Sequence, residues 1–320
     1  MIELGTSQAD VLRLRFAVSP LWEVLAAVRA VDGGPLPPAL LPWRRTVTPP
    51  PTPLLAAVPR GRRYTPDFLT PPPEAGERSI DAEIDLVAAT PLPVVRQELS
   101  RCLDDGPPDP LVARPAGRPR QARDQVVREL RLAWEGLLRP SWPRLHRVLA
   151  LDVDHRSRRL VAGGIAALIE DLDRRVTWDG STLRVRAAAR ERRTLHGEGI
   201  VLMPSVFGVG RPIVILDPPY QPTLVYGARG VATAFTEPVA PSGALVQLLG
   251  RTRALLLAAL DEPAGTGHLA IALGRTAGTV SEHLHALRAA GLVDVRRTGK
   301  SSRWLRTHLG DALVAGRLPA

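Results

Sequence analysis

Residues 266–307 most restrict the fold of this chain, because two short helical patterns are followed there by two alternating ones. A helix over 276–290 is predicted by an apolar stripe at helical spacing, by the hydroxyl of Thr276 as an N-cap and by Gly291 as its stop. The stripe consists of Val280, Leu284 and Leu287. A shorter helix over 266–273 precedes it. The segment therefore predicts two helices joined by a tight turn.

The outer face of the helix 276–290 is small or polar, as a helix that enters a DNA major groove must be. Short or hydrogen-bonding side chains can approach base edges, whereas bulky apolar ones cannot. Two short helices joined by a turn that contains Gly274 form a helix-turn-helix. The candidate DNA-contacting residues of the second helix are Thr276, Gly278, Thr279, Ser281, Glu282, His285 and Arg288.

Residues 292–307 predict two strands around a turn at 298–301, which is a basic wing that can reach phosphates or the minor groove. Nine basic and four acidic residues lie between 251 and 306, so half of the net charge of +10 sits in under a fifth of the chain. The basic residues of the hairpin are Arg296, Arg297, Lys300, Arg303 and Arg306. The candidate DNA contacts among them are Arg296, Arg297, Lys300 and Arg303.

The overall charge of the chain is weaker evidence for a nucleic-acid partner than the clustering of basic residues in the hairpin. The net charge of +10 and the pI of about 11.1 favour a polyanionic partner. Lys300 is the only lysine, the other 41 basic residues are arginines, and asparagine is absent. Such a composition is typical of codon bias in a GC-rich genome. Only the position of the arginines can therefore carry a functional argument.

Residues 268–307, HLAIALGRTAGTVSEHLHALRAAGLVDVRRTGKSSRWLRT, resemble the winged-helix regulators of the ArsR/SmtB type. The likeness includes the V-S-x-H-L core that begins at Val280, the L-R-x-A-G-L-V junction and the R-R-x-G-[RK] wing that ends at Lys300. The resemblance implies a recognition helix and a wing. Its recognition-helix positions match Thr276, Thr279, Ser281 and His285, and its wing positions match Arg297, Lys300 and Arg303.

The rest of the chain is similar to a region that precedes winged helices in uncharacterised regulators of high-GC bacteria. The stretches that carry this likeness are LRFAVSPLWEVLAAVRA, VLMPSVFGVGRPIVI and TLVYGARGVA. The helical and strand patterns along the chain predict an α+β protein, and Pro238 to Gly243 (PVAPSG) marks a boundary between two domains. We expect an N-terminal effector or dimerisation domain, 1–240, which is helical over 1–174 and strand-rich over 175–240, and a winged helix-turn-helix domain, 241–320.

The helical part is predicted from periodicity and capping. Leu12 to Phe16 alternate as a strand, and Ser19-Pro20 begins a helix that ends near Gly33. The proline-rich stretch 35–73 holds many large apolar residues, which favours packed turns over a flexible linker. Residues 79–138 predict three helices and 141–174 two more, while 244–260 predicts a single helix.

The strand-rich part starts with a hairpin over 176–185 around Asp179-Gly180. Apolar runs at 200–206, 213–216, 223–226 and 231–235 then predict a small antiparallel sheet. Residues 111–160 contain 12 arginines and five acidic residues. This excess fits either solvated helix faces or a second basic surface.

Several classes of protein are disfavoured by what the sequence lacks. Cys102 stands alone, and no apolar run of membrane length or secretory leader pattern occurs, so we expect a cytoplasmic protein without membrane contact. His308 and Asp311 form at most half of a metal-sensing set, which predicts no metal and no cofactor. The motifs GxSxG, HExxH and GxxxxGK[ST] are absent, and we expect no enzyme.

The leading hypothesis is a transcriptional regulator, a homodimeric repressor that reads a palindromic operator in double-stranded DNA. The N-terminal domain would supply the dimer interface, a pocket for a small-molecule effector, or both. Two alternatives stay open. One is an enzyme whose helix-turn-helix contacts protein, and the other is an architectural protein that binds DNA without sequence preference.

Overall fold

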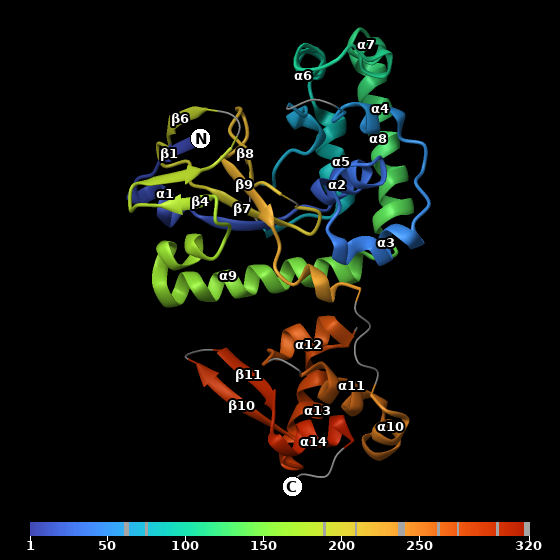
Figure 1. The fold of residues 1–320 in the computed structure, drawn as a ribbon, viewed down its shortest axis with the longest axis vertical. Coiled ribbons are helices and arrows are strands. Elements are labelled where there is room, and N and C mark those ends of the chain that lie inside the picture. The colour runs from blue at the N-terminus through green and yellow to red at the C-terminus, as the bar shows by residue number, and fades with distance from the viewer. Residues whose placement is uncertain are drawn as a thin grey trace. The chain divides into compact units, whose positions relative to one another are not determined.

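The computed structural model describes residues 1–60, 64–73, 76–187, 190–208, 210–235, 241–260, 263–273, 275–298 and 301–316. The chain divides into two compact units, Met1–Phe235 and Thr236–Ala320 (Figure 1). Both helices and sheets of mixed strand direction are present, so the protein is of mixed α and β structure, consistent with an α+β class. The expected division after residue 240 falls at the edge of 236–240, which lies outside the described residues.

The first unit combines sheets with a helical part (Figure 1). Its strands are β1 (Ile2–Gly5), β2 (Arg15–Val18), β3 (Gly76–Glu77), β4 (Val176–Trp178), β5 (Thr182–Val185), β6 (Glu191–Thr194), β7 (Val201–Ser205), β8 (Ile213–Ile215) and β9 (Thr223–Gly227). They form one sheet in the order β4-β5-β1-β6 and a second in the order β3-β2-β7-β9-β8. The hairpin predicted around Asp179-Gly180 is confirmed, since β4 and β5 pair antiparallel.

The antiparallel sheet predicted for 200–235 is wrong, because most of its pairs are parallel. β7 lies between β2 and β9 and is parallel to both, and only β8 runs antiparallel to β9. β2, from the start of the chain, is thus inserted beside strands that follow it by almost 200 residues. Every residue of β7 is buried, as parallel strands covered on both faces require. The fourth run forms no strand but the 3-10 turn η4 (Val231–Thr233).

The helices of the first unit begin with α1 (Gln8–Leu12), α2 (Pro20–Val31), α3 (Leu41–Thr46) and α4 (Pro53–Ala57). They continue with α5 (Ile80–Ala89), α6 (Leu92–Asp104), α7 (Pro110–Ala116), α8 (Pro119–Ala133) and α9 (Trp142–Glu170). Short turns of other helical types are η1 (Pro38–Leu40), η2 (Asp67–Leu69) and η3 (Trp134–Leu138). α9 extends beneath the sheets in the view of Figure 1 and contacts β4, β7 and β2.

Local signals predicted some of these helices correctly and others not. Ser19 caps α2, and its hydroxyl accepts a hydrogen bond from the Trp22 N–H at 3.0 Å. Leu12 is the last residue of α1 and is exposed. The strand predicted to begin at Leu12 therefore begins only at Arg15. The stretch 79–138 holds α7 in addition to the three expected helices, because Asp109 caps a further helix within the turn-rich segment. α9 is broken at Gly163 and Gly164, in agreement with two helices.

Two apolar cores hold the first unit together. One joins the two sheets through Leu4, Leu183, Leu202 and Leu224, and the end of α9 closes it. The other lies among the helices, with Trp43 at its centre and fully buried. Trp43 and the buried side chains of α4 and η2 confirm that the described residues of the stretch 35–73 are packed and are not a linker.

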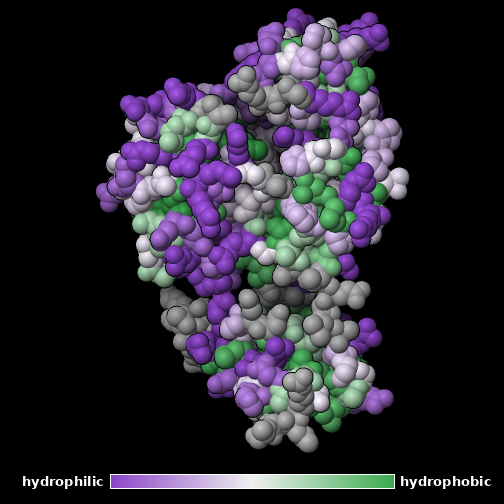
Figure 2. All heavy atoms as spheres, in the orientation of Figure 1, coloured by the Kyte–Doolittle hydropathy of each residue, from purple (hydrophilic) through white to green (hydrophobic). Residues whose placement is uncertain are grey.

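Some of the arginines between 111 and 160 make internal contacts. Arg156 is 1% exposed and forms ion pairs with Asp152 and Asp171. Asp152 also accepts a hydrogen bond from the Tyr226 hydroxyl at 2.8 Å, which ties α9 to β9. On the face shown in Figure 2, hydrophilic and apolar residues are interspersed over both units. In the described part of the chain, no helix is both long enough and apolar enough to cross a membrane.

The second unit comprises α10 (Gly243–Leu249), α11 (Arg251–Ala259), α12 (Thr266–Leu273), α13 (Ala277–Ala289), β10 (Val293–Thr298), β11 (Ser301–Arg306) and α14 (His308–Ala315). The single helix predicted over 244–260 is wrong: Gly250, with φ +78°, separates α10 from α11. β10 and β11 form the predicted antiparallel hairpin. Leucines of α11 and α13 pack with Leu269, Val293 and Trp304 in one core.

Candidate nucleic-acid interface

α13 is fixed in the second unit by a cap at its start and an apolar stripe along its length. The Thr276 hydroxyl accepts a hydrogen bond from the Thr279 N–H at 3.2 Å, which confirms the predicted N-cap. Val280, Leu284 and Leu287 are at most 1% exposed, so the predicted buried stripe is also confirmed. Both features follow from local sequence, because capping and helical spacing need no distant partner.

The opposite face of α13 is open to solvent. Gly278, Glu282, His285 and Arg288 are exposed, and Ser281 is half-buried. The hydroxyls of Thr276 and Thr279 lie 2.9 Å apart, so part of their hydrogen-bonding capacity is used within the helix. The structure thus places all of the helical candidate residues on or beside one accessible face.

Gly278 has no role in the packing of the second unit. A Cβ atom built there would meet only the Thr276 hydroxyl, at 3.9 Å, and its backbone is not in the left-handed region. Gly278 is the second residue of α13 and is exposed, so the bare backbone of the first turn is accessible there.

The hairpin alternates an apolar face with a polar one. Val295 is opposite Trp304 and faces the core, whereas Arg296 is opposite Arg303 on the other face. Like charges directly opposite each other on a sheet are destabilising. Arg303 turns back and donates a hydrogen bond to the carbonyl oxygen of Pro263 at 3.0 Å. Arg296 is exposed beside it.

Trp304 connects the hairpin to the helices. Its backbone exchanges two hydrogen bonds with Ala264, N–H to O distances of 2.8 and 2.9 Å, and its indole N–H donates to the Thr266 hydroxyl at 3.0 Å. The ring of His285 meets the Trp304 ring edge-on, with centroids 5.2 Å apart. His285 is therefore both exposed and held in position by the hairpin.

Arg306 is not a free cation of the wing, contrary to the expectation for this hairpin. Its guanidinium pairs with Asp311 of α14 at 2.7 Å and donates to the carbonyl oxygens of Leu257 and Ala258. The strand position explains this difference, because Arg306 is opposite Val293 and so shares the core-facing side of the hairpin.

One basic residue escaped the assignment from sequence. Arg275 is exposed directly before the N-cap of α13, where the first free N–H groups of the helix also lie. Its proximity to Thr276 was the signal that could have found it. At the other end of α13, Arg288 Nε lies 3.6 Å from Asp294 Oδ1, and about half or more of each side chain is exposed. Water screens such a pair, so Asp294 neutralises little of the positive charge of Arg288.

Some of the candidates cannot be placed. Lys300 lies outside the described residues, as do Gly299 and Gly274, and only the backbone of Arg297 is described. Among the residues that the structure describes, no group of three or more His, Cys, Asp or Glu side chains is arranged to hold a metal ion.

The family match found for this chain lies within the first unit. Residues 96–232, from α6 to η4, match a family described as a family of unknown function, DUF5937. The match covers less than half of the chain. No curated protein matches the chain. No solved structure matches it.

Proposed function

We propose that the protein is a DNA-binding transcriptional regulator that reads duplex DNA with the exposed face of α13. The observation that carries the proposal is the division of α13 into a buried leucine stripe and an open polar face that begins at an exposed N-terminus. A helix of this kind can enter a major groove with its first turns while its other side stays in the core.

The order of elements supports the proposal. α11, α12 and α13 are followed by the β10-β11 hairpin, and Ala264 adds a short bridge to the hairpin beside Trp304. This is the order of a winged helix-turn-helix, which the likeness of residues 268–307 to ArsR/SmtB-type regulators led us to expect. In such a module the hairpin lies beside the recognition helix, as the contact between His285 and Trp304 provides here.

The charges of the exposed residues also favour a polyanion. Arg275 precedes the helix, Arg288 is near its end, and Arg296 faces outward on the hairpin beside Arg303. Phosphate oxygens would offset the repulsion between Arg296 and Arg303 and would complement the partial positive charge of the α13 N-terminus. We infer that these arginines position the module and that Ser281, Glu282 and His285 contact base edges.

A single module of this size contacts only a few base pairs. We propose that the protein is a homodimer that binds a palindromic operator, with half-sites about one helical turn apart, and that it acts as a repressor.

Gly278→Leu is expected to reduce DNA binding without unfolding the second unit. The leucine side chain would project from α13 into the space that a groove wall must occupy, and the fold has room for its Cβ atom. We expect a loss of about tenfold or more in affinity for the protein's own upstream DNA, measured by fluorescence anisotropy.

Gly243→Leu is the matched control, since Gly243 opens α10, has no atom within 4 Å of a built Cβ and lies outside the proposed interface. Circular dichroism should show the same helix content in both variants. Unchanged affinity of Gly278→Leu for DNA would exclude α13 as the groove-reading helix.

Arg296→Ala is expected to weaken binding to all duplexes alike and to reduce the slope of log K against log salt by about one, because it removes one phosphate contact. Arg253→Ala, which removes an equally exposed arginine of α11, should leave the slope unchanged. Titration at several salt concentrations, with the upstream region and a scrambled duplex, measures both effects.

The same titrations separate the regulator from the alternatives. A specific regulator prefers its own site to the scrambled duplex by about a thousandfold or more. Equal affinity for both would identify an architectural DNA-binding protein, and no binding to either at low salt would contradict the proposal in all its forms.

A further inference from the structure

Two adjoining hollows lie between α2 and the strands β7 and β8 of the first unit. The larger has a volume of about 280 Å³ and the smaller about 100 Å³. Trp22, Ala26, Arg29 and Ile213 line both, so the hollows share a wall and form one site, which we call the Arg29 cavity. Its size and its partly apolar lining are typical of sites for small organic molecules.

Arg29 is a half-buried cation without an anionic partner among the described residues. Burial lowers the pKa of its guanidinium below the ordinary value, and no carboxylate offsets that cost. A desolvated guanidinium normally pairs with a carboxylate or phosphate. Arg29 lines both hollows, and its guanidinium carries five N–H donors that a ligand in either hollow could accept from.

Two buried hydroxyls also line the cavity. Ser205 is 1% exposed, and its hydroxyl, in the smaller hollow, lies beside the buried Glu23 carboxyl. The hydroxyl of Tyr64, in the larger hollow, is buried beside the Asp67 backbone and has no hydrogen-bond acceptor among the described residues. Buried polar groups are nearly always hydrogen-bonded in native proteins. The Tyr64 hydroxyl and the Arg29 guanidinium both lack an acceptor among the described residues, and a ligand in this cavity could supply one to each.

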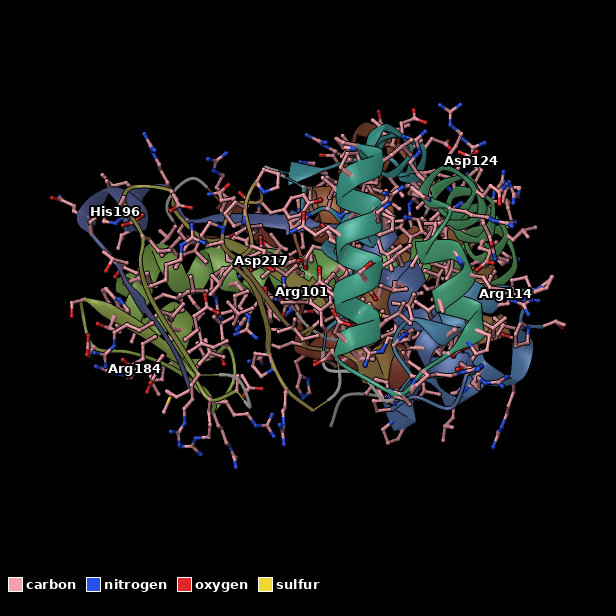
Figure 3. The ribbon with its side chains drawn as sticks, turned by 90° about the horizontal axis from the view of Figure 1, so that it is seen from above. Arg101, Arg114, Asp124, Arg184, His196 and Asp217 are labelled. Atoms are coloured by element: carbon pink, nitrogen blue, oxygen red, sulfur yellow. The ribbon has the colours of Figure 1, made fainter. Side chains whose placement is uncertain are left out.

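The opposite charge in the cavity does not neutralise Arg29. Asp67 lines the larger hollow, and burial, together with Glu98 and Asp217, raises the pKa of its carboxyl to about 7. Asp217 itself is bound by Arg101 of α6, as Figure 3 shows. The Tyr64 ring is held by the Arg101 guanidinium, 4.0 Å from its centroid. These contacts fix the far end of the cavity without reaching Arg29.

We propose that the Arg29 cavity binds a small aromatic carboxylate, with its carboxylate on Arg29 and its ring against Trp22 and Ile213. A planar carboxylate matches the guanidinium fork in two parallel hydrogen bonds. The ring fills the apolar part of the larger hollow, and a hydroxyl at its far end would meet Tyr64. The site does not depend on the proposed function in DNA binding.

The test uses the full-length protein and three probes: cinnamate, its neutral isostere cinnamamide, and para-hydroxycinnamate. We expect cinnamate to bind at least about tenfold more tightly than cinnamamide, because only the carboxylate pairs with Arg29. Isothermal titration calorimetry measures each affinity. Para-hydroxycinnamate should bind more tightly than cinnamate, and Tyr64→Phe should remove that difference.

Arg29→Met should abolish the preference for the carboxylate, while Arg131→Met, the matched control on the exposed side of α8, should retain it. If Arg29→Met unfolds the protein, Ile213→Trp provides a second test. Ile213 is 41% exposed, so the fold should tolerate the larger ring. That ring would fill the cavity, and cinnamate binding should be lost. Equal binding of cinnamate and cinnamamide, no binding of cinnamate at millimolar concentration, or unchanged binding by the Ile213 variant would overturn the proposal.

Discussion

Glu23→Gln should reduce the stability loss that the wild-type protein undergoes as the pH rises from about 4.5 to about 8. Glu23 lies on α2 and is 1% exposed. Burial raises the pKa of its carboxyl from 4.5 to about 8. Hydrogen bonds from the Ser205 hydroxyl and from the Val206 N–H, which donates to Oε2 at 3.2 Å, offset only part of the cost of the charge. Folding therefore favours the protonated form.

The direction of the effect follows from proton linkage. Below the unfolded pKa, Glu23 is neutral in both states and costs nothing. Between the unfolded and the folded pKa, the unfolded state has lost its proton while the folded state keeps it, so the free energy of unfolding falls with pH until the folded pKa is passed. At roughly 1.4 kcal/mol per pKa unit, the full fall from this one residue is about 5 kcal/mol.

Glutamine keeps an oxygen that can accept the Val206 N–H and carries no charge at any pH, so the variant should be more stable than wild type at about pH 9 and similar at about pH 5. Urea unfolding followed by tryptophan fluorescence measures this, since five of the six tryptophans belong to the first unit. Burial also raises the pKa of Glu83 and that of Asp67 to about 7, so the variant keeps a smaller slope of stability against pH.

Glu191→Gln is the matched control, because Glu191 is exposed on β6 and should show the wild-type dependence on pH. Parallel curves of stability against pH for wild type and Glu23→Gln would mean that the buried carboxyl is not the titrating group.

The sequence predicted the features that depend on neighbours in the chain. The caps at Ser19 and Thr276 and the leucine stripe of α13 were found because a cap needs only three following residues and a helical face repeats every three to four. The β10-β11 hairpin was found for the same reason. Where a local signal was interrupted by one residue, prediction failed: leucines continue on both sides of Gly250, but its positive φ ends one helix and starts another.

Features that depend on distant partners could not be predicted in this way. The strand periodicity of 200–226 is compatible with either direction of pairing, and only the arrival of β2 from the N-terminus makes the sheet mostly parallel. The Arg29 cavity has the same origin. Its polar groups come from α2, from the segment after α4 and from β7, and nothing in the spacing of Arg29, Tyr64 and Ser205 indicates that they meet.

The second large effect is expected for Leu284→Ala. Leu284 is fully buried in the core that α13 forms with α11 and the hairpin, and its truncation should leave a cavity that costs about 2 to 5 kcal/mol. Opening of the second unit would then increase by about 30-fold or more. Hydrogen exchange of the full-length protein, followed by mass spectrometry, measures this in peptides of α13 and leaves those of the first unit as an internal reference.

Leu248→Ala is the matched control, because Leu248 belongs to the same unit and is 68% exposed, so its truncation should change exchange little. If α13 acts as proposed, the loss of DNA binding by Leu284→Ala should follow the fraction of unfolded second unit as temperature is varied. Gly278→Leu differs in that respect, since it should lose binding at every temperature while α13 stays protected. Binding lost in Leu284→Ala with no change in exchange would contradict the buried role of Leu284, because the leucine would then have to contact DNA itself.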